Sequence, residues 1–205
     1  MEEKWLEWAK KIQALSQAGL AYSKDIYDIE RFQELRTISC EMVSELTQNP
    51  FDTIQSVFAS ETGYQTPKTD IRAVIFQEDR LLLVKEKEDQ KWSLPGGWAD
   101  IGLSPAEVAV KEVQEETGLE VQAVRLLAVL DKKCHPHPPS LHHVYKLFFE
   151  CSVTGGHLEA GIETADAAFF SKDALPELSP SRITRGQLEL LFSYLDNPGR
   201  LPVFD

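Results

Sequence analysis

The chain has 205 residues, of which 42% are hydrophobic, so it can form one sizeable domain and a second, smaller one. Its formal net charge of −12 argues against a large basic surface, so nucleic acid is not a favoured partner. No apolar run approaches the roughly 20 residues that cross a membrane, and the first residues do not resemble a signal peptide, so we expect a cytoplasmic protein without membrane contact. Cys40, Cys134 and Cys151 lie far apart in the sequence, so we expect reduced thiols rather than disulfides.

The N-terminal third of the chain predicts helices. Large apolar residues recur at helical spacing over the first fifteen positions, and Gly19 is expected to end this helix. Asp25 or Asp28 is expected to cap a second helix, which Pro50 stops. Asp52 then begins a shorter third helix. These helices predict a small all-α domain.

A strand-like pattern follows this helical part. The apolar runs 71–76 and 81–84 flank the turn 77–80, which predicts a hairpin. Further elements are expected as strands at 121–130, 143–152 and 167–170, and as a last helix at 183–196. Strands with helices around them predict an α+β fold of the α/β/α sandwich type.

Between these strands the chain contains a helix whose two ends are specified by local residues. Ser104 and Glu107 form a capping box around Pro105, and Gly118 provides a left-handed stop, so the helix runs from Pro105 to Thr117. Leu103 lies just before the cap.

This helix carries Glu112, Glu115 and Glu116 on one face, because their spacing is i, i+3 and i+4. Such clusters are commonly solvated acidic faces. A hard divalent cation offers a second interpretation, because Mg²⁺ binds carboxylate oxygens together with substrate phosphates. In a chain of such negative charge, a cation would also be needed to hold a phosphate ester.

The surrounding residues resemble the Nudix box. Residues 94–97 read Leu-Pro-Gly-Gly, and residues 111–119 read Lys-Glu-Val-Gln-Glu-Glu-Thr-Gly-Leu, close to the family's closing run with lysine in place of arginine. The resemblance implies the Nudix α/β/α sandwich with a mixed sheet and a Mg²⁺- or Mn²⁺-dependent hydrolase. It places the metal site at Gly97, Glu112, Glu115 and Glu116, with Glu116 also catalytic.

Two positions depart from the family pattern. Leu103 stands where the family has a glutamate, and Lys111 stands where it has an arginine. In the family these positions are associated with an ion pair that braces the loop against the helix. We expect a hydrophobic staple between Leu103 and Val108 to replace that brace.

The family also needs a general base, taken either from the box or from a later loop. Residues 161–170 resemble the segment that often supplies one, and Glu163 is the preferred candidate over Glu159 and Asp166. The alternative for Glu163 is an ordinary exposed loop acid.

Substrate-binding candidates lie outside the box. Arg72 is charged within an apolar strand, so it either pairs with an acid or meets a phosphate. His143 and Tyr145 follow a proline-rich loop, 134–139, and are expected at the rim of the substrate pocket. The cysteine and histidines of this loop do not match a structural zinc pattern. Arg182 is expected to form a surface salt bridge.

A second resemblance lies at the N-terminus. Residues 17–32 are similar to the helical extension of a Nudix subgroup that hydrolyses nucleoside diphosphates linked to another moiety, such as ADP-ribose or CDP-choline. It implies a helical domain over 1–66, for dimerisation and substrate contribution, and a Nudix hydrolase domain over 67–205.

The resulting interpretation is a pyrophosphohydrolase that releases a nucleoside monophosphate and phospho-X from a small nucleotide substrate, as a homodimer. Two alternatives remain open. One is an RNA-end nuclease of the decapping type, and the other is a non-catalytic nucleotide sensor.

Overall fold

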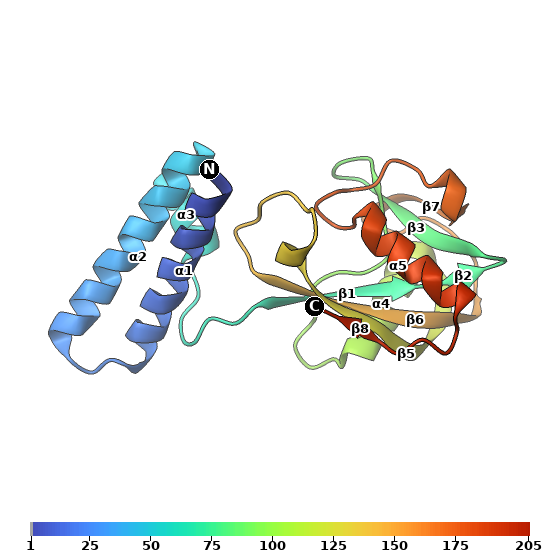
Figure 1. Ribbon diagram of the computed structural model, residues 1–205, viewed down its shortest axis with the longest axis horizontal. Coiled ribbons are helices and arrows are strands. Elements are labelled where there is room, and N and C mark those ends of the chain that lie inside the picture. The colour runs from blue at the N-terminus through green and yellow to red at the C-terminus, as the bar shows by residue number, and fades with distance from the viewer. Residues whose placement is uncertain (1) are drawn as a thin grey trace. The chain divides into compact units, whose positions relative to one another are not determined.

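The computed structural model describes residues 2–205, with side chains from Lys4 onward. It divides into two compact units, each described here by itself: residues up to 67 together with 139–143, and residues 68–138 together with 144–205 (Figure 1). Within residues 2–205, no helix has both the length and the apolar character needed to cross a membrane.

The helical unit contains α1 (Glu2–Tyr22), α2 (Ile26–Thr47) and α3 (Phe51–Phe58). The carboxylate of Asp25 accepts hydrogen bonds from the backbone N–H groups of Tyr27 and Asp28, so Asp25 is the N-cap of α2.

The prediction that Gly19 ends the first helix is wrong, because α1 continues to Tyr22. A Cβ atom at Gly19 would lie 2.5 Å from the ring of Phe32 on α2. Glycine at this position therefore allows the two helices to pack closely. Local sequence cannot distinguish this use of glycine from helix termination, because the partner ring lies on another helix.

The second unit is built on two sheets. One has the strand order β1-β6-β5-β8, in which β1 and β6 are parallel and β6 and β5 are antiparallel, so it is mixed. The other has the order β2-β3-β4, with β7 also paired to β3. The strands are β1 (Lys68–Val74), β2 (Phe76–Gln77), β3 (Arg80–Glu86), β4 (Trp92–Ser93), β5 (Leu119–Asp131), β6 (Val144–Gly156), β7 (Thr164–Ser171) and β8 (Val203–Phe204).

The predicted hairpin is only partly correct. The apolar run 71–76 divides at Ile75: β1 pairs with β6, and only Phe76-Gln77 pairs with β3. A continuous apolar run gives no local signal for this change of sheet, because β6, the partner of its first half, lies far away in the sequence.

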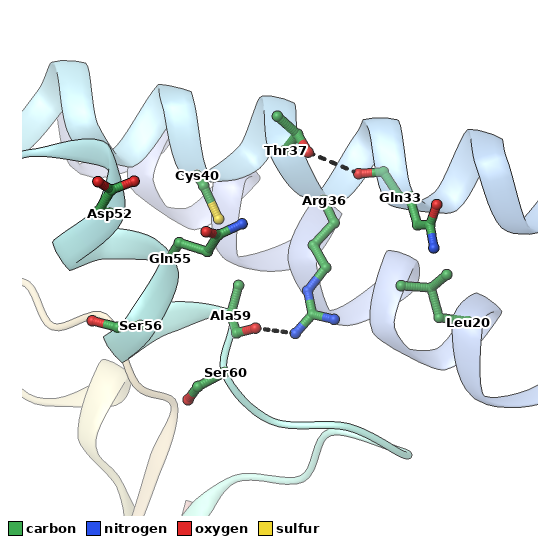
Figure 2. Close-up of a pocket in the computed structure, with 10 residues that line it drawn as sticks. All are labelled: Leu20, Gln33, Arg36, Thr37, Cys40, Asp52, Gln55, Ser56, Ala59 and Ser60. Carbon is green, nitrogen blue, oxygen red and sulfur yellow. Dashed lines mark hydrogen bonds between the residues drawn. The ribbon is translucent and has the colours of Figure 1, made fainter.

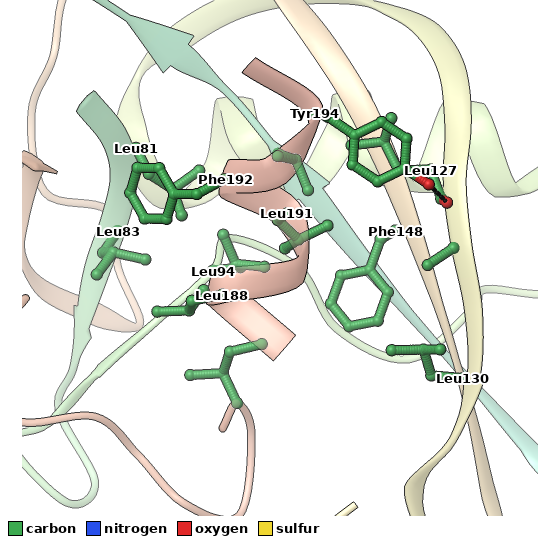
Figure 3. Close-up of a cluster of buried hydrophobic side chains, with 13 residues drawn as sticks. Leu81, Leu83, Leu94, Leu127, Leu130, Phe148, Leu188, Leu191, Phe192 and Tyr194 are labelled. Carbon is green, nitrogen blue, oxygen red and sulfur yellow. Dashed lines mark hydrogen bonds between the residues drawn. The ribbon is translucent and has the colours of Figure 1, made fainter. Parts of the chain in front are cut away.

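Helices α4 (Pro105–Thr117) and α5 (Arg185–Asp196) cover opposite faces of the strands. Ala73 of β1 packs in the same buried cluster as Val113 of α4. Its neighbour Val74 lies in a different cluster. That cluster contains Leu188 and Leu191 of α5 (Figure 3). Because successive strand residues point to opposite faces, this division places a helix on each side. The predicted α/β/α sandwich with a mixed sheet, preceded by a helical region, is confirmed.

Candidate active site

A cleft of about 530 Å³ lies in the sheet-containing unit. Its lining combines the middle of β1, the end of β3, the segment after β4, residues of α4 and later loops. Charged side chains dominate it and include Asp70, Arg72, Glu86, Glu112, Glu116, Glu163 and Arg182. Gly97 and Trp98 also line it.

The segment 94–97 runs beside β1 and forms one wall of the cleft. The backbone N–H of Ile71 donates to the carbonyl of Gly97 at 2.8 Å, and that of Ala73 donates to Pro95 at 2.9 Å. Gly96 has φ +139°, and a Cβ atom there would lie 2.0 Å from the carbonyl oxygen of Ile71. Only glycine fits this close approach, so backbone geometry requires glycine at position 96.

Glu116 is buried in the cleft, and its Oε2 accepts a hydrogen bond from the backbone N–H of Gly96 at 3.0 Å. Burial raises the pKa of Glu116 to about 8, against the opposing effects of the Arg72 charge and of this hydrogen bond. Glu86 and Glu112 raise the pKa further because they are like charges. A nearby cation would stabilise the ionised form of such a buried carboxyl group more than that of an exposed one.

Glu112 lies one helical turn away, against the glycine wall. A Cβ atom at Gly97 would approach its Oε1 to 3.0 Å, so glycine leaves room for this carboxylate. Partial burial raises the pKa of Glu112, and Lys111 is the main group that opposes this shift.

Glu115 differs from these two glutamates. Its side chain is exposed and lies 3.4 Å from Nζ of Lys111, and it is not among the residues that line the cleft. The structure therefore brings Gly97, Glu112 and Glu116 together and turns Glu115 toward the surface.

The same lysine replaces the expected hydrophobic brace. Nζ of Lys111 lies 2.8 Å from Oδ2 of Asp100, which joins the loop before α4 to the helix. Leu103 is 39% exposed and does not belong to the cluster around Val108. The expected Leu103–Val108 staple therefore does not brace the loop against the helix. The ion pair between Lys111 and Asp100 does so instead.

The donor atoms of this region suit a hard divalent ion. Glu112 and Glu116 offer carboxylate oxygens beside the backbone of Gly97, which is the donor chemistry that Mg²⁺ and Mn²⁺ prefer. In residues 2–205, no group of three or more acidic, histidine or cysteine side chains is already gathered as a metal centre. The predicted metal residues thus fit the ion chemically. Gly97, Glu112 and Glu116 lie in the cleft, and Glu115 does not.

Glu163 lies on a loop that is attached to the end of α4. The hydroxyl of Thr164 donates to the carbonyl of Glu116 at 2.8 Å, and the backbone N–H of Gly161 donates to the same oxygen at 3.1 Å. Nζ of Lys87 donates to the carbonyl of Ile162 at 2.6 Å. The Glu163 side chain is exposed and lines the cleft, so its backbone is held while its carboxylate faces solvent.

Arg72 is buried and pairs with an acid, one of the two alternatives for this residue. Its Nε donates to Asp70 Oδ1 at 2.8 Å, and its Nη1 donates to the carbonyl of Leu94 at 2.9 Å. Asp70 also pairs with the buried Lys146. Burial raises the pKa of Asp70, but Arg72 and Lys146 outweigh it and hold the pKa below its ordinary value.

Sequence reasoning missed Asp70 and Lys146. The signal for Asp70 was its position two residues before Arg72, which puts both on one face of a strand. Lys146 is likewise the charged residue in the otherwise apolar stretch that follows Tyr145.

Arg182 is a second guanidinium in the cleft. Its Nε lies 3.2 Å from Oε1 of the buried Glu86, and its Nη2 lies 2.6 Å from Oε2 of Glu88. Ser93 donates a hydrogen bond to the same Glu86 oxygen at 2.6 Å. The salt bridges expected for Arg182 are present, but they hold it in the cleft wall rather than on an open surface.

The two rim candidates are not part of this cleft lining. His143 belongs to the helical unit. Tyr145 lies on β6, is 40% exposed and is absent from the lining residues. In the preceding loop, His135 contacts Asp205 at 3.1 Å.

Two family models match the chain. Residues 3–58 match the UDP-X-like N-terminal oligomerisation domain, and residues 66–191 match the NUDIX domain. YjhB of Bacillus subtilis, provisionally named an ADP-ribose pyrophosphatase, is 51% identical over 100% of this chain and 99% of its own. An ADP-ribose pyrophosphatase of Methanocaldococcus jannaschii is 33% identical over 57% of this chain and 69% of its own.

Solved structures resemble the chain in the same way. An ADP-ribose pyrophosphatase of Streptococcus suis is 44% identical with a TM-score of 0.62, over 68% of this chain and 100% of its own. A UDP-X diphosphatase is 32% identical with a TM-score of 0.64, over 100% of this chain and 99% of its own. The helical and the sheet-containing parts therefore both have counterparts in one solved protein.

Proposed function

Because this chain belongs to the Nudix family and is a pyrophosphatase of that family, we propose that it hydrolyses nucleoside diphosphates linked to a second moiety, X. Water adds to one phosphorus, the bridging P–O bond breaks, and the products are a nucleoside monophosphate and phospho-X. The observation that carries this proposal is the pair Glu112 and Glu116 in one charged cleft, both with raised pKa values.

The substrate class is supported by two relatives that cover the whole chain. Their names give ADP-ribose and UDP-linked compounds, so these are the first two substrates to test. CDP-choline remains the third, on the resemblance of residues 17–32. The identity of the full-length relative favours an enzyme over the non-catalytic sensor, and the net charge of −12 disfavours the RNA-end alternative.

We assign the divalent ion, Mg²⁺ or Mn²⁺, to Glu112 and Glu116 beside Gly97, with Glu115 as a further ligand once its side chain leaves Lys111. When bound, the ion supplies positive charge to the phosphates and favours ionisation of water. The raised pKa values of Glu112 and Glu116 support the assignment, because burial disfavours their ionised forms and a bound cation would favour them.

Other residues of the cleft are assigned to the substrate and to the proton. Glu163 accepts the proton of the attacking water, since its carboxylate lines the cleft from a loop tied to α4. Arg72 and Arg182 supply positive charge for the phosphates. Trp98 lines the cleft and is 54% exposed, so it offers an aromatic face to a nucleobase.

The helical unit is proposed to join two copies of the chain. On α1, Gln13, Ser16 and Gln17 are buried, whereas Trp8 and Leu15 are 44% and 62% exposed. A helix that buries polar residues and exposes apolar ones is expected to pack its apolar side against another surface. The oligomerisation family model over residues 3–58 supports a second copy as that partner.

A separate pocket of the helical unit is lined by Arg36, Cys40 and Asp52, among others, and has a volume of about 460 Å³ (Figure 2). Arg36 is engaged by the backbone carbonyls of Ala59 and Glu61 rather than directed at a ligand. We therefore assign this pocket to the packing of α2 against α3.

A substrate panel tests the function directly. The protein is incubated with ADP-ribose, a UDP-linked sugar or CDP-choline, with Mg²⁺ or Mn²⁺, in oxygen-18 water. The products are then identified by mass spectrometry. The proposal requires metal-dependent release of a nucleoside monophosphate, and the labelled product identifies the attacked phosphorus. Absence of turnover on every member of the panel, with either ion, would sink it.

A further inference from the structure

Lys146 is a buried cation outside the cleft lining. It lies on β6 with 1% of its surface exposed, directly beside Asp70 in the parallel β1–β6 register. Its Nζ contacts Oδ2 of Asp70. Because a buried ammonium group loses its hydration, a lysine here destabilises the fold unless its ion pair compensates. A hydrophobic residue would fill this sheet position at lower cost.

A continuous series of contacts leads from this lysine to the cleft. Lys146 contacts one oxygen of Asp70, and Nε of Arg72 donates to the other at 2.8 Å. Nη1 of Arg72 donates to the carbonyl of Leu94 at 2.9 Å. Two residues later, the N–H of Gly96 donates to Oε2 of Glu116 at 3.0 Å.

Each contact in this series restricts the next one. With both oxygens of Asp70 engaged, the carboxylate cannot rotate without losing a charged hydrogen bond. The planar guanidinium of Arg72 is then held from two sides, by Asp70 and by the backbone of Leu94. Leu94 begins the wall segment whose Gly96 orients Glu116, so the segment cannot shift without disturbing Arg72.

We propose that Lys146 is a positioning residue that fixes Glu116 through Asp70, Arg72 and the segment 94–97. It touches neither substrate nor ion, and its effect on catalysis is transmitted by hydrogen bonds. The proposal rests on the proposed function in one respect only, the assignment of a divalent ion to Glu116. It accounts for a buried charge that the fold itself does not need.

The test is Mn²⁺ binding to the full-length protein, measured by calorimetry, with kcat and KM measured in parallel. Lys146→Met removes the ammonium group but keeps much of its volume. We expect Mn²⁺ to bind about tenfold more weakly and kcat to fall about tenfold, since partners behind metal ligands are typically worth 10–100-fold. KM for the nucleotide should rise as well, because Arg72, which is assigned to the phosphates, belongs to the same series of contacts. Lys146→Gln keeps a donor for Asp70 and should recover part of both losses.

Tyr194→Phe is the matched control for lost stability. The hydroxyl of Tyr194 is buried and donates to the carbonyl of Leu127 in the core under α5, away from the contacts of Glu116 (Figure 3). This variant should lower the melting temperature but leave Mn²⁺ binding within twofold. Lys146→Met with wild-type Mn²⁺ affinity and kcat overturns the inference.

Two further outcomes are separated by design. If Lys146→Met does not fold, Asp70→Asn/Lys146→Met removes the carboxylate together with the ammonium group, and the same criterion applies to it. If the wild-type protein itself binds no Mn²⁺, the proposed metal site fails, and the positioning role of Lys146 falls with it. Weak binding confined to the Lys146 variants supports the positioning role alone.

Discussion

Nζ of Lys111 and Oδ2 of Asp100 lie 2.8 Å apart and join the loop before α4 to the helix that carries the glutamates. Both side chains are partly exposed, so the pair contributes little to global stability. Its role is local, because the loop closes the cleft beside Glu112.

Lys111→Met is therefore expected to weaken activity without unfolding the protein. We expect kcat to fall severalfold, with a melting temperature no lower than that of Arg80→Met, which removes a similarly exposed pair with Glu78. Steady-state kinetics and thermal unfolding measure the two effects.

Leu103→Glu should leave activity little changed, and a large gain in activity would show that the loop lacks a brace.

Glu116→Gln tests the assignment of the metal residue. The amide keeps the size of the side chain and can still accept the Gly96 hydrogen bond, but it loses the charge. We expect kcat to fall by more than about 100-fold, because even partners behind metal ligands are worth 10–100-fold. Glu189→Gln on the exposed side of α5 is the matched control. Activity retained in Glu116→Gln would rule out this residue as a ligand.

The raised pKa of Glu116 predicts a proton released on metal binding. Burial holds this pKa at about 8 in the folded chain, against an ordinary value of 4.5. Because the pKa is higher in the folded chain than in the unfolded chain, the protonated Glu116 stabilises the fold. This contribution to the free energy of unfolding is complete below pH 4.5 and is lost as the pH rises through 8. A divalent ion needs the ionised form, so binding at pH 7 displaces a proton.

Calorimetry in two buffers measures this proton. Titrations with Mn²⁺ at pH 7 in PIPES and in Tris should give apparent enthalpies that differ, because the buffers take up the proton with different heats. The difference should shrink above pH 9, where the Glu116 proton is already lost. Equal enthalpies at pH 7 would mean that the carboxylate is ionised before the metal binds.

Features set by neighbouring residues were predictable from the sequence, and those set by distant ones were not. The α4 boundaries follow from Ser104 and Gly118, which act within one turn, and the observed capping box agrees with this. The Nudix resemblance and the fold are confirmed for the same reason, since their motif is contiguous. By contrast, the contact of Asp70 with Lys146 joins residues on strands β1 and β6, and no local pattern reveals their register.

Glu163→Gln tests the assignment of the general base. We expect kcat to fall by 10²–10⁴-fold, the usual contribution of general base catalysis, with Mn²⁺ affinity unchanged. Glu159→Gln, an exposed acid of the same loop region, should retain activity. If Glu159→Gln carries the loss instead, the base is assigned to the wrong carboxylate.

The exposed apolar side of α1 predicts a dimer that a single charge can disrupt. Trp8 and Leu15 lie seven residues apart, two helical turns, and therefore on one side of the helix. Trp8→Glu and Leu15→Glu each place a carboxylate in the proposed contact, where burial without a partner is unfavourable. Light scattering after size exclusion should show a dimer for the wild type and a monomer for each variant. Glu189→Lys, at an exposed charged position on α5, should remain dimeric, and a dimer in all variants would place the contact elsewhere.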